Sequence, residues 1–296
     1  MSLRPTRILV IRFSSIGAII LTAPAIESLR AAMHGPCEIH FLTKSSMQAV
    51  AKGLGNLIDC IHTIDQTTSE VTESLKSAQF DYIVDLHSNV RSRAVKRSLG
   101  CVSFTLKKAN FAKWLMVLGM RKQPVAHIVE RYIDSFRGAF SAKTPRAWPL
   151  LFESSPLPAQ FDATAGPWDV LVVGAAHAGK QMPQELMHSI ILRAQASGRR
   201  MVLIGGKADV PIGSALSEWS KNAVINLVGM TSIAESAALL RDAKHAHAGD
   251  TGMMHLSAAM QTPVASIWGC TRPSLGMSPW LPPEGSELIL PAGKNP

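Results

Sequence analysis

The feature that most constrains the fold is an alternation of short apolar runs with segments of helical periodicity. Residues 7–13 (RILVIRF) form a mainly apolar run that contains several β-branched side chains and lies between Pro5 and Ser14. Such a run is typical of a strand that is buried on both faces of a parallel sheet. A helical pattern follows over residues 16–33. Further strands are expected at residues 37–43, 58–64 and 80–86, with polar helical segments between them and a longer amphipathic helix over residues 126–140.

The alternation starts again after a segment that interrupts it. Residues 152–167 contain three prolines and show no period, which indicates a linker. Beyond it, strands are expected at residues 169–175, 200–205, 223–227, 244–248 and 264–268, and helices at residues 183–197, 233–241 and 252–260. We therefore predict an α/β protein of two Rossmann-like domains with parallel sheets, residues 1–155 and 156–296. Ligands of such sheets bind beyond the carboxyl ends of the strands, so a cleft between the domains is the expected site.

Charge is distributed unevenly between the two halves. Residues 1–150 contain 20 Lys and Arg against 10 Asp and Glu, a net +10, whereas residues 151–296 contain 10 against 11, a net −1. Between Asp85 and Glu130 there is no acidic residue. We expect the first half to attract an anionic partner, for which nucleic acid, anionic lipid and a phosphorylated glycan all qualify. A solvated basic face without a partner is the alternative.

Several classes of protein are disfavoured by the sequence. No stretch reaches the roughly 18 apolar residues that a membrane-spanning helix requires. The four cysteines form no CxxC pair, so neither a disulfide framework nor a zinc site is expected, and a reducing cytoplasm fits. The sequence has no GxxxxGK loop followed by Ser or Thr and no GxGxxG loop, which disfavours P-loop and dinucleotide-binding proteins.

The loop after the first predicted strand has side chains suited to an anionic ligand. Ser14 and Ser15 can donate hydroxyl hydrogen bonds, and Gly17 permits a tight turn into the helix that follows. The free amides at the start of a helix favour anions. A simple helix cap is the competing interpretation.

Two loops of the second half have a similar character. Asp250, Thr251 and Gly252 precede a predicted helix, with His255 one turn further on, and this arrangement predicts a cradle for a phosphate or pyrophosphate. An Asp or Thr cap with a packed His explains the same residues without a ligand. Lys180 lies on a loop beside a glycine, where it can bind the phosphates of a nucleotide or remain a solvated surface charge.

A fourth loop follows the predicted strand at residues 80–86. Its arginines are expected where a ligand of the first domain would lie, and guanidinium groups suit bidentate recognition of carboxylate or phosphate. The candidate binding residues of this loop are Asn89, Arg91 and Arg93.

In this order, the segments resemble glycosyltransferase family 9, the heptosyltransferases. The family pattern SSIGD followed by LTxP is similar to residues 14–24 (SSIGAIILTAP), and DLxxNxRS is similar to residues 85–92 (DLHSNVRS). Four further motifs follow in order: HxVERY at residues 127–132, KxWP at residues 180–183 (KQMP), VLIGG at residues 202–206 and DTGxMHLxAA at residues 250–259. The resemblance spans roughly residues 7–280.

The resemblance implies a GT-B fold, in which two Rossmann-like domains face each other across a cleft. It implies an inverting, metal-independent transfer of a heptose from an ADP-sugar donor, with no other cofactor. The acceptor would be a phosphorylated lipopolysaccharide core held by the basic first domain of a cytoplasmic protein in peripheral contact with the inner membrane. Nucleic acid is not expected as a partner, since aromatic residues make up only 6% of the chain.

The roles of the family's site residues follow from the same resemblance. The second domain would bind the nucleotide sugar, with Lys180 on the donor phosphate and stabilising charge on the leaving diphosphate. Donor-binding residues would be Ser14, Ser15, Gly17, Lys180, Asp250, Thr251, Gly252 and His255. Acceptor-binding residues would be Asn89, Arg91 and Arg93.

The sequence departs from the family pattern at the catalytic base. In the family, an Asp directly after SSIG deprotonates the acceptor hydroxyl, whereas this chain has Ala18, which cannot accept a proton. Help from a general base is typically worth about 10²–10⁴-fold in rate. Three explanations remain open: an engineered inactivating change, a natural loss, or a different base such as His87 or Asp85. Met182 also stands in place of the family's Trp.

Two other functions compete with sugar transfer. A catalytically impaired or silent homologue that binds nucleotide sugar or glycan would explain Ala18. An epimerase of nucleotide sugars with two such domains would share the fold, but it would not explain the basic first half.

Overall fold

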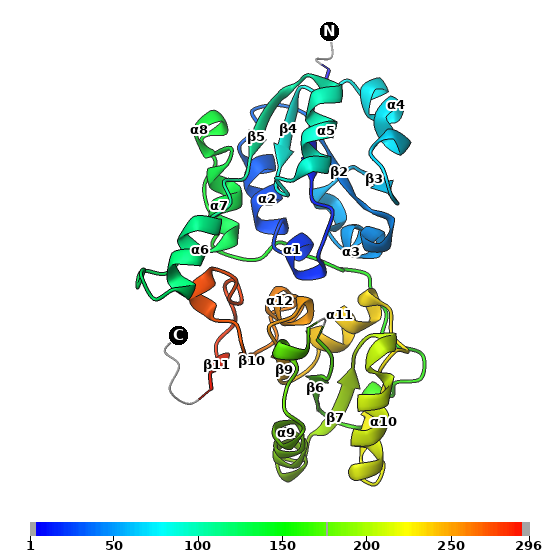
Figure 1. The fold of residues 1–296 in the computed structure, drawn as a ribbon. Coiled ribbons are helices and arrows are strands. Elements are labelled where there is room, and N and C mark those ends of the chain that lie inside the picture. The colour runs from blue at the N-terminus through cyan, green and yellow to red at the C-terminus, as the bar shows by residue number, and fades with distance from the viewer. Residues whose placement is uncertain (1–3, 176, 292–296) are drawn as a thin grey trace. The chain divides into compact units, whose positions relative to one another are not determined.

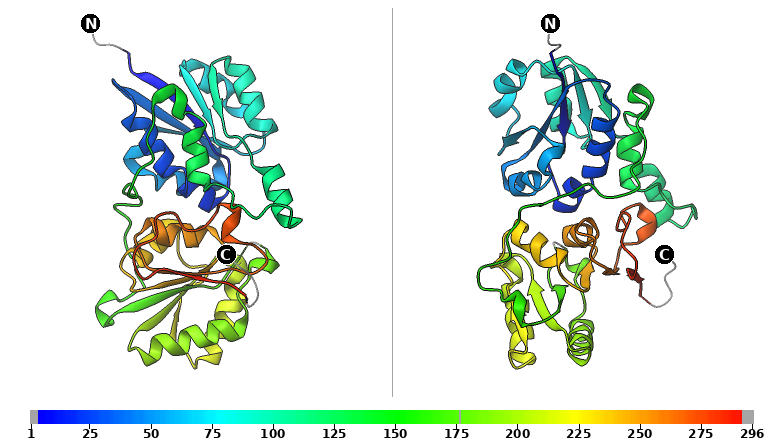
Figure 2. Two further views of the ribbon diagram at one scale, coloured as in Figure 1. Left: turned by 90° about the vertical axis from the view of Figure 1, so that its left-hand side faces the viewer. Right: turned by 180° about the vertical axis from the view of Figure 1, so that it is seen from behind.

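The computed structural model describes residues 4–175 and 177–291, and the strand pairs within this part of the chain are parallel. The chain divides into two compact units, Met1–Leu151 and Phe152–Pro296 (Figure 1). Each unit is built on one parallel sheet with helices on both sides, as the two further views in Figure 2 show. The predicted α/β class is therefore confirmed. Among the described residues, no helix is long and apolar enough to cross a membrane.

The first unit contains a sheet with the strand order β3-β2-β1-β4-β5. Its strands are β1 (Thr6–Ile11), β2 (Cys37–Lys44), β3 (Cys60–Ile64), β4 (Tyr82–Asp85) and β5 (Val102–Thr105). Its α-helices are α1 (Ile16–Ile20), α2 (Ala23–Ala31), α3 (Gln48–Lys52), α4 (Ser69–Ser77), α5 (Val90–Leu99), α6 (Asn110–Val117), α7 (Ile128–Asp134) and α8 (Arg137–Phe140).

The central strand β1 explains why this sheet is covered on both faces. Leu9 and Ile11 pack in a cluster with Leu75 of α4 and Val95 of α5. The alternate residue Val10 points to the other face and is equally inaccessible to solvent. A run that is apolar at every position, rather than at every second one, thus produces a strand buried between two layers of helices.

The second unit repeats the scheme with the strand order β11-β10-β9-β6-β7-β8. Its strands are β6 (Trp168–Val172), β7 (Arg200–Ile204), β8 (Val224–Asn226), β9 (Ala246–Gly249), β10 (Val264–Ile267) and β11 (Glu287–Ile289). Its α-helices are α9 (Gln184–Ala196), α10 (Val210–Trp219), α11 (Ile233–Arg241) and α12 (Gly252–Ala259). Leu171 and Leu203 pack against α9 and α10 on one face, and α12 contacts β9 and β10.

Two predicted helices are each divided in the structure. The single helix predicted over residues 16–33 is wrong, because α1 ends at Ile20 and α2 begins at Ala23. Pro24 cannot donate a backbone hydrogen bond and would collide with the carbonyl one turn earlier, so a continuous helix is impossible there. The helix predicted over residues 126–140 likewise consists of α7 and α8, with Phe136 outside the helical conformation between them.

The connection from β4 to α5 is organised by one buried carboxylate. Asp85 is inaccessible to solvent and accepts hydrogen bonds from the backbone N–H of His87 at 3.1 Å and of Ser88 at 2.7 Å. It also accepts from the Ser92 hydroxyl at 2.7 Å and forms an ion pair with Lys96 Nζ at 3.0 Å. Ser92 and Asn89 then close a capping box at the start of α5. One side chain therefore fixes both the turn and the helix that follows it.

We expect Asp85→Ala to reduce the free energy of unfolding by about 3 kcal/mol, because it removes the carboxylate partner of Lys96 and leaves two backbone N–H groups without their acceptor. Urea denaturation of the full chain followed by circular dichroism measures this change. Glu73→Ala is the control, since its ion pair with Lys76 is exposed and contributes less than about 0.5 kcal/mol. Equal effects of the two substitutions would contradict the assignment.

Candidate active site

Three loops of the second unit meet beyond the carboxyl ends of the adjacent strands β6, β9 and β10. The backbone N–H of Cys270, after β10, donates to the carbonyl of Gly179, after β6, at 3.2 Å. A Cβ atom at Gly269 would lie 2.6 Å from the same carbonyl oxygen, and one at Gly249 would lie 2.9 Å from the carbonyl oxygen of Lys180. Both positions therefore require glycine, because the backbone of the Lys180 loop passes too close for a side chain.

This packing brings Lys180 to the start of helix α12. Its Nζ lies 2.7 Å from Oδ2 of Asp250, whose side chain is only 10% exposed. An ammonium group has three donors, so the pair with Asp250 orients the lysine and leaves donors for a second acceptor. The first backbone N–H groups of α12 lie next to this cation, and both attract anions.

The hydroxyl of Thr251 is available at the same place. Thr251 is the N-cap residue of α12, yet its Oγ1 is buried and has no hydrogen-bond partner among the described residues. Oγ1 of Thr271, in the loop after β10, is in the same condition. Gly252 is the first residue of α12, and His255 lies within that helix and is buried. Buried polar atoms normally have partners, so these hydroxyl groups are suited to contacts with a ligand.

In the first unit, Arg12 connects the carboxyl ends of β1 and β4. Its guanidinium donates to the carbonyl of Leu86 at 2.6 Å and lies over the ring of Tyr132 on α7. Ser14 and Ser15 continue the chain from here into α1, where Ser15 is the N-cap residue but makes no capping bond through its side chain within the described structure. Helix α1 has only five residues, so the anion-binding effect expected of its start is weaker than that of a long helix.

Ala18 and Gly17 lie inside α1 and are buried. The side chain of Ala18 provides no proton acceptor, and its carbonyl accepts a hydrogen bond from the Tyr132 hydroxyl at 3.4 Å. The position is therefore next to Arg12 and Tyr132 at the carboxyl edge of β1, but it lacks the group that the family pattern places there.

The two alternative bases differ sharply in their surroundings. The carboxylate of Asp85 is occupied by the β4–α5 turn and by Lys96, so it is poorly placed to take a proton from a substrate. For His87, burial, the positive charges of Arg12 and Lys108 and, more weakly, that of Lys44 lower the pKa to about 4. Its Nδ1 has no hydrogen-bond partner in the part of the chain that the structure describes. The ring is thus neutral near pH 7 and holds an unused nitrogen.

The predicted acceptor residues lie at the start of α5. The side chain of Asn89 accepts a hydrogen bond from the backbone N–H of Ser92, so its oxygen is used in capping. Arg91 and Arg93 are exposed. Residues two apart on a helix are separated by about 200° around its axis, so these arginines project from opposite sides of α5, and each would contact a ligand separately.

Sequence reasoning missed the cations that gather around His87. Arg12 follows β1, Lys44 ends β2 and Lys108 follows β5, and all three act on the His87 ring. Each lies at or just after a strand end, which is the signal that could have found them. Neither the unpartnered hydroxyl of Thr271 nor the ion pair of Lys180 with Asp250 was predicted from the sequence.

The sequence is similar to curated heptosyltransferases over part of its length. Over 80 residues, 26% of this chain, the sequence is 31% identical to lipooligosaccharide heptosyltransferase 2 of Haemophilus influenzae. That match covers 23% of the relative's length, and the match to the corresponding protein of Haemophilus ducreyi covers 27% of its length. The matched segment therefore spans about a quarter of the length of each of these curated relatives.

Solved structures share the whole fold at low identity. A glycosyltransferase of family 9 from Veillonella parvula superposes with a TM-score of 0.75 at 19% identity, over 98% of this chain and 86% of the other. The ADP-heptose lipopolysaccharide heptosyltransferase II of E. coli superposes with a TM-score of 0.73 at 18% identity, over 96% and 90% of the two chains. The predicted GT-B fold class is confirmed by these likenesses.

The model of glycosyltransferase family 9 (heptosyltransferase) matches residues 69–282, which is well over half of the chain. Together with the two parallel α/β units and the loops gathered at their carboxyl edges, this match shows that the chain belongs to glycosyltransferase family 9.

Proposed function

We propose that this protein transfers a heptose or a related sugar from an ADP-sugar to an anionic lipopolysaccharide inner-core acceptor, with inversion and without a metal at the reacting atoms. The observation that carries the proposal is the ion pair of Lys180 with Asp250 beside the start of α12. A lysine ammonium, free backbone N–H groups and an unused threonine hydroxyl at one point suit a diphosphate. The second unit is then the donor-binding domain.

Negative charge grows on the diphosphate as the bond to the sugar breaks. Lys180 and the amides at the start of α12 are fixed in position before the reaction, so they stabilise that charge without having to reorganise. Asp250 holds the lysine in place. No metal is needed for this step, because the cation is supplied by a side chain.

The first unit is proposed to hold the acceptor. Arg12, Lys44 and Lys108 gather at the carboxyl edge of its sheet, and Asn89, Arg91 and Arg93 lie at the start of α5 near the same edge. A phosphorylated core oligosaccharide carries the negative charges that such a surface attracts. Peripheral contact with the anionic inner face of the inner membrane, from the cytoplasm, follows from the same attraction.

The second candidate function is a silent homologue that binds nucleotide sugar or glycan without transfer. Ala18 favours it, because its side chain can accept no proton. Transfer requires another base, for which His87 is the candidate: its imidazole is neutral, but burial and nearby cations that lower its pKa to about 4 make it a weak base. The two functions are separated by the presence or absence of turnover in a chain that binds ADP.

Calorimetric titration with ADP is the first test of the donor site. We expect ADP to bind in preference to UDP and GDP, and Lys180→Ala to weaken binding by about 10–100-fold, the value of a lost charge-assisted hydrogen bond. Lys244→Ala is the matched control, because Lys244 is exposed in the same unit just before the amino end of β9. Binding that is absent, or unaffected by Lys180→Ala, would refute the proposed donor site.

A second test concerns the loop that positions Lys180. Gly269→Ala places a methyl group against the carbonyl of Gly179, so the loop must move and we expect about a tenfold loss of ADP affinity with a lower melting temperature. Gly138→Ala is the control, since the space around Gly138 is open. Unchanged affinity in Gly269→Ala would show that the loop does not hold the nucleotide.

The third test restores the missing base. We expect Ala18→Asp to raise the rate of heptosyl transfer to a lipopolysaccharide core acceptor by about 10²–10⁴-fold. Ala31→Asp, at the exposed end of α2, controls for the added charge. A fall in wild-type turnover in His87→Gln, with no gain in Ala18→Asp, would identify His87 as the base. No turnover in any variant that still binds ADP would establish the silent homologue.

A further inference from the structure

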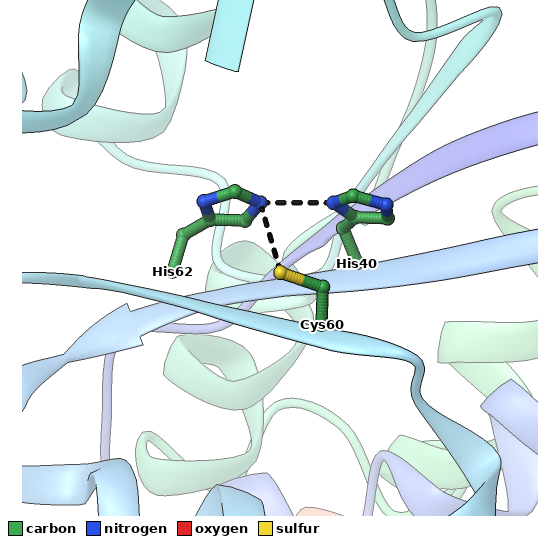
Figure 3. A group of neighbouring side chains, drawn as sticks. All are labelled: His40, Cys60 and His62. Atoms are coloured by element: carbon green, nitrogen blue, oxygen red, sulfur yellow. Dashed lines mark hydrogen bonds between the residues drawn. The ribbon is translucent and has the colours of Figure 1, made fainter. Parts of the chain in front are cut away.

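A cluster of metal-ligand side chains lies on the first sheet, and the proposed transfer does not use it. His40 of β2 stands opposite Cys60 of β3, and His62 follows two residues later on the same face of β3. His40 Nδ1 lies 2.9 Å from His62 Nε2, and Cys60 Sγ lies 3.7 Å from the same His62 nitrogen. Figure 3 shows the three side chains converging from the two neighbouring strands. Their ligand atoms all lie within 4.8 Å of one another.

We propose that His40, Cys60 and His62 form a binding site for a divalent transition metal of the zinc type. Two imidazole nitrogens and a sulfur suit zinc and its neighbours, whereas magnesium and calcium take oxygen ligands. Tetrahedral bonds of about 2.0–2.1 Å to nitrogen and about 2.3 Å to sulfur place two nitrogens about 3.3 Å apart and nitrogen and sulfur about 3.6 Å apart. The observed separations of 2.9 and 3.7 Å differ from these by a few tenths of an ångström.

A carboxylate lies behind one of the ligands. Oε2 of Glu38 is 3.8 Å from Nε2 of His40, which is the ring nitrogen that does not face the cluster. A carboxylate in this position keeps the proton on Nε2 and leaves Nδ1 as the ligand. Glu38 is itself held by Arg7 Nε at 2.7 Å. Because Arg7 already neutralises Glu38, the negative charge at the ligand atoms comes from the Cys60 thiolate.

The surroundings allow a metal to enter but restrict its coordination. The ring of Phe80 stands edge-on to both imidazoles, and its centroid lies 5.0 Å from that of His40 and 6.3 Å from that of His62. His40, Cys60 and His62 are each partly exposed, so an ion can reach them from solvent. Three protein ligands leave a fourth position, which a water molecule can fill.

The place of the cluster in the sheet indicates what the metal does. Cys60 is the first residue of β3, and His40 lies in the middle of β2, so the cluster is not at the carboxyl edge where Arg12 and His87 gather. Strand β3 is the edge of the sheet and pairs only with β2 among the described strands. A metal bound across β2 and β3 fastens this edge strand and stabilises the first unit by binding only its folded form.

Cobalt is the probe that tests the site in the full chain. After treatment with a chelator, we expect one equivalent of Co²⁺ to produce the thiolate-to-cobalt charge-transfer band and the visible bands of tetrahedral cobalt, and Zn²⁺ to displace it. Zn²⁺ should also raise the melting temperature of the stripped protein. Cys60→Ser should abolish the charge-transfer band, and Glu38→Gln should weaken binding by about 10–100-fold.

Cys270→Ser is the matched control, because Cys270 is an exposed free thiol in the second unit and its loss should leave the band unchanged. If Cys60→Ser lowers the melting temperature in the presence of chelator, the variant is destabilised, and alkylation of the wild-type protein is used instead. Zn²⁺ should then protect Cys60 from alkylation but not Cys270, which mass spectrometry of the peptides measures. Absence of a charge-transfer band, its survival in Cys60→Ser, or equal alkylation of Cys60 with and without Zn²⁺ would overturn the proposal. ADP binding is measured separately and does not bear on it.

Discussion

Both units depend on a central strand that is buried on its two faces, β1 in the first and β6 in the second. Leu9 and Val10 of β1, and Val170 and Leu171 of β6, are inaccessible to solvent although they alternate between faces. Neighbours in a parallel sheet run in one direction, so each connection crosses back over a face and every strand ends at the same edge. Burial of apolar side chains thereby decides where the polar loops gather.

Charged side chains are arranged differently at the carboxyl edges of the two sheets. In the second unit, Lys180 is paired with Asp250 at the start of α12, so a cation and helix amides are held at one point. In the first unit, the carboxylate of Asp85 binds the backbone of the β4–α5 turn and Lys96, so it does not form an ion pair with the cations around His87. A localised cation suits a diphosphate, and a broader positive surface suits a phosphorylated glycan. This difference is the physical basis of the proposed division into a donor-binding and an acceptor-binding domain.

The carboxyl edge and the outer strand of the first sheet have different proposed roles. Its carboxyl edge holds a histidine whose protonation is suppressed by burial and nearby cations, and the helix that follows β1 has Ala18, which offers no side-chain proton acceptor. The proposed metal site lies on β2 and the edge strand β3, where an unprotected strand is the weakest part of a sheet. Fastening the edge there leaves the loops at the carboxyl ends free to meet a substrate.

The sequence by itself determined the fold class and the loops that matter, because apolar runs that alternate with helical segments, such as residues 8–11, are typical of parallel sheets, and such sheets collect their loops at one edge. It did not find β5 and β11, which are only four and three residues long and contain polar residues, so that neither forms an apolar run. Only the tertiary structure decided which charges meet. Lys180 and Asp250, or His40 and His62, are joined by strand order and register, and distances of a few ångströms between residues far apart in the chain follow from packing rather than from local pattern.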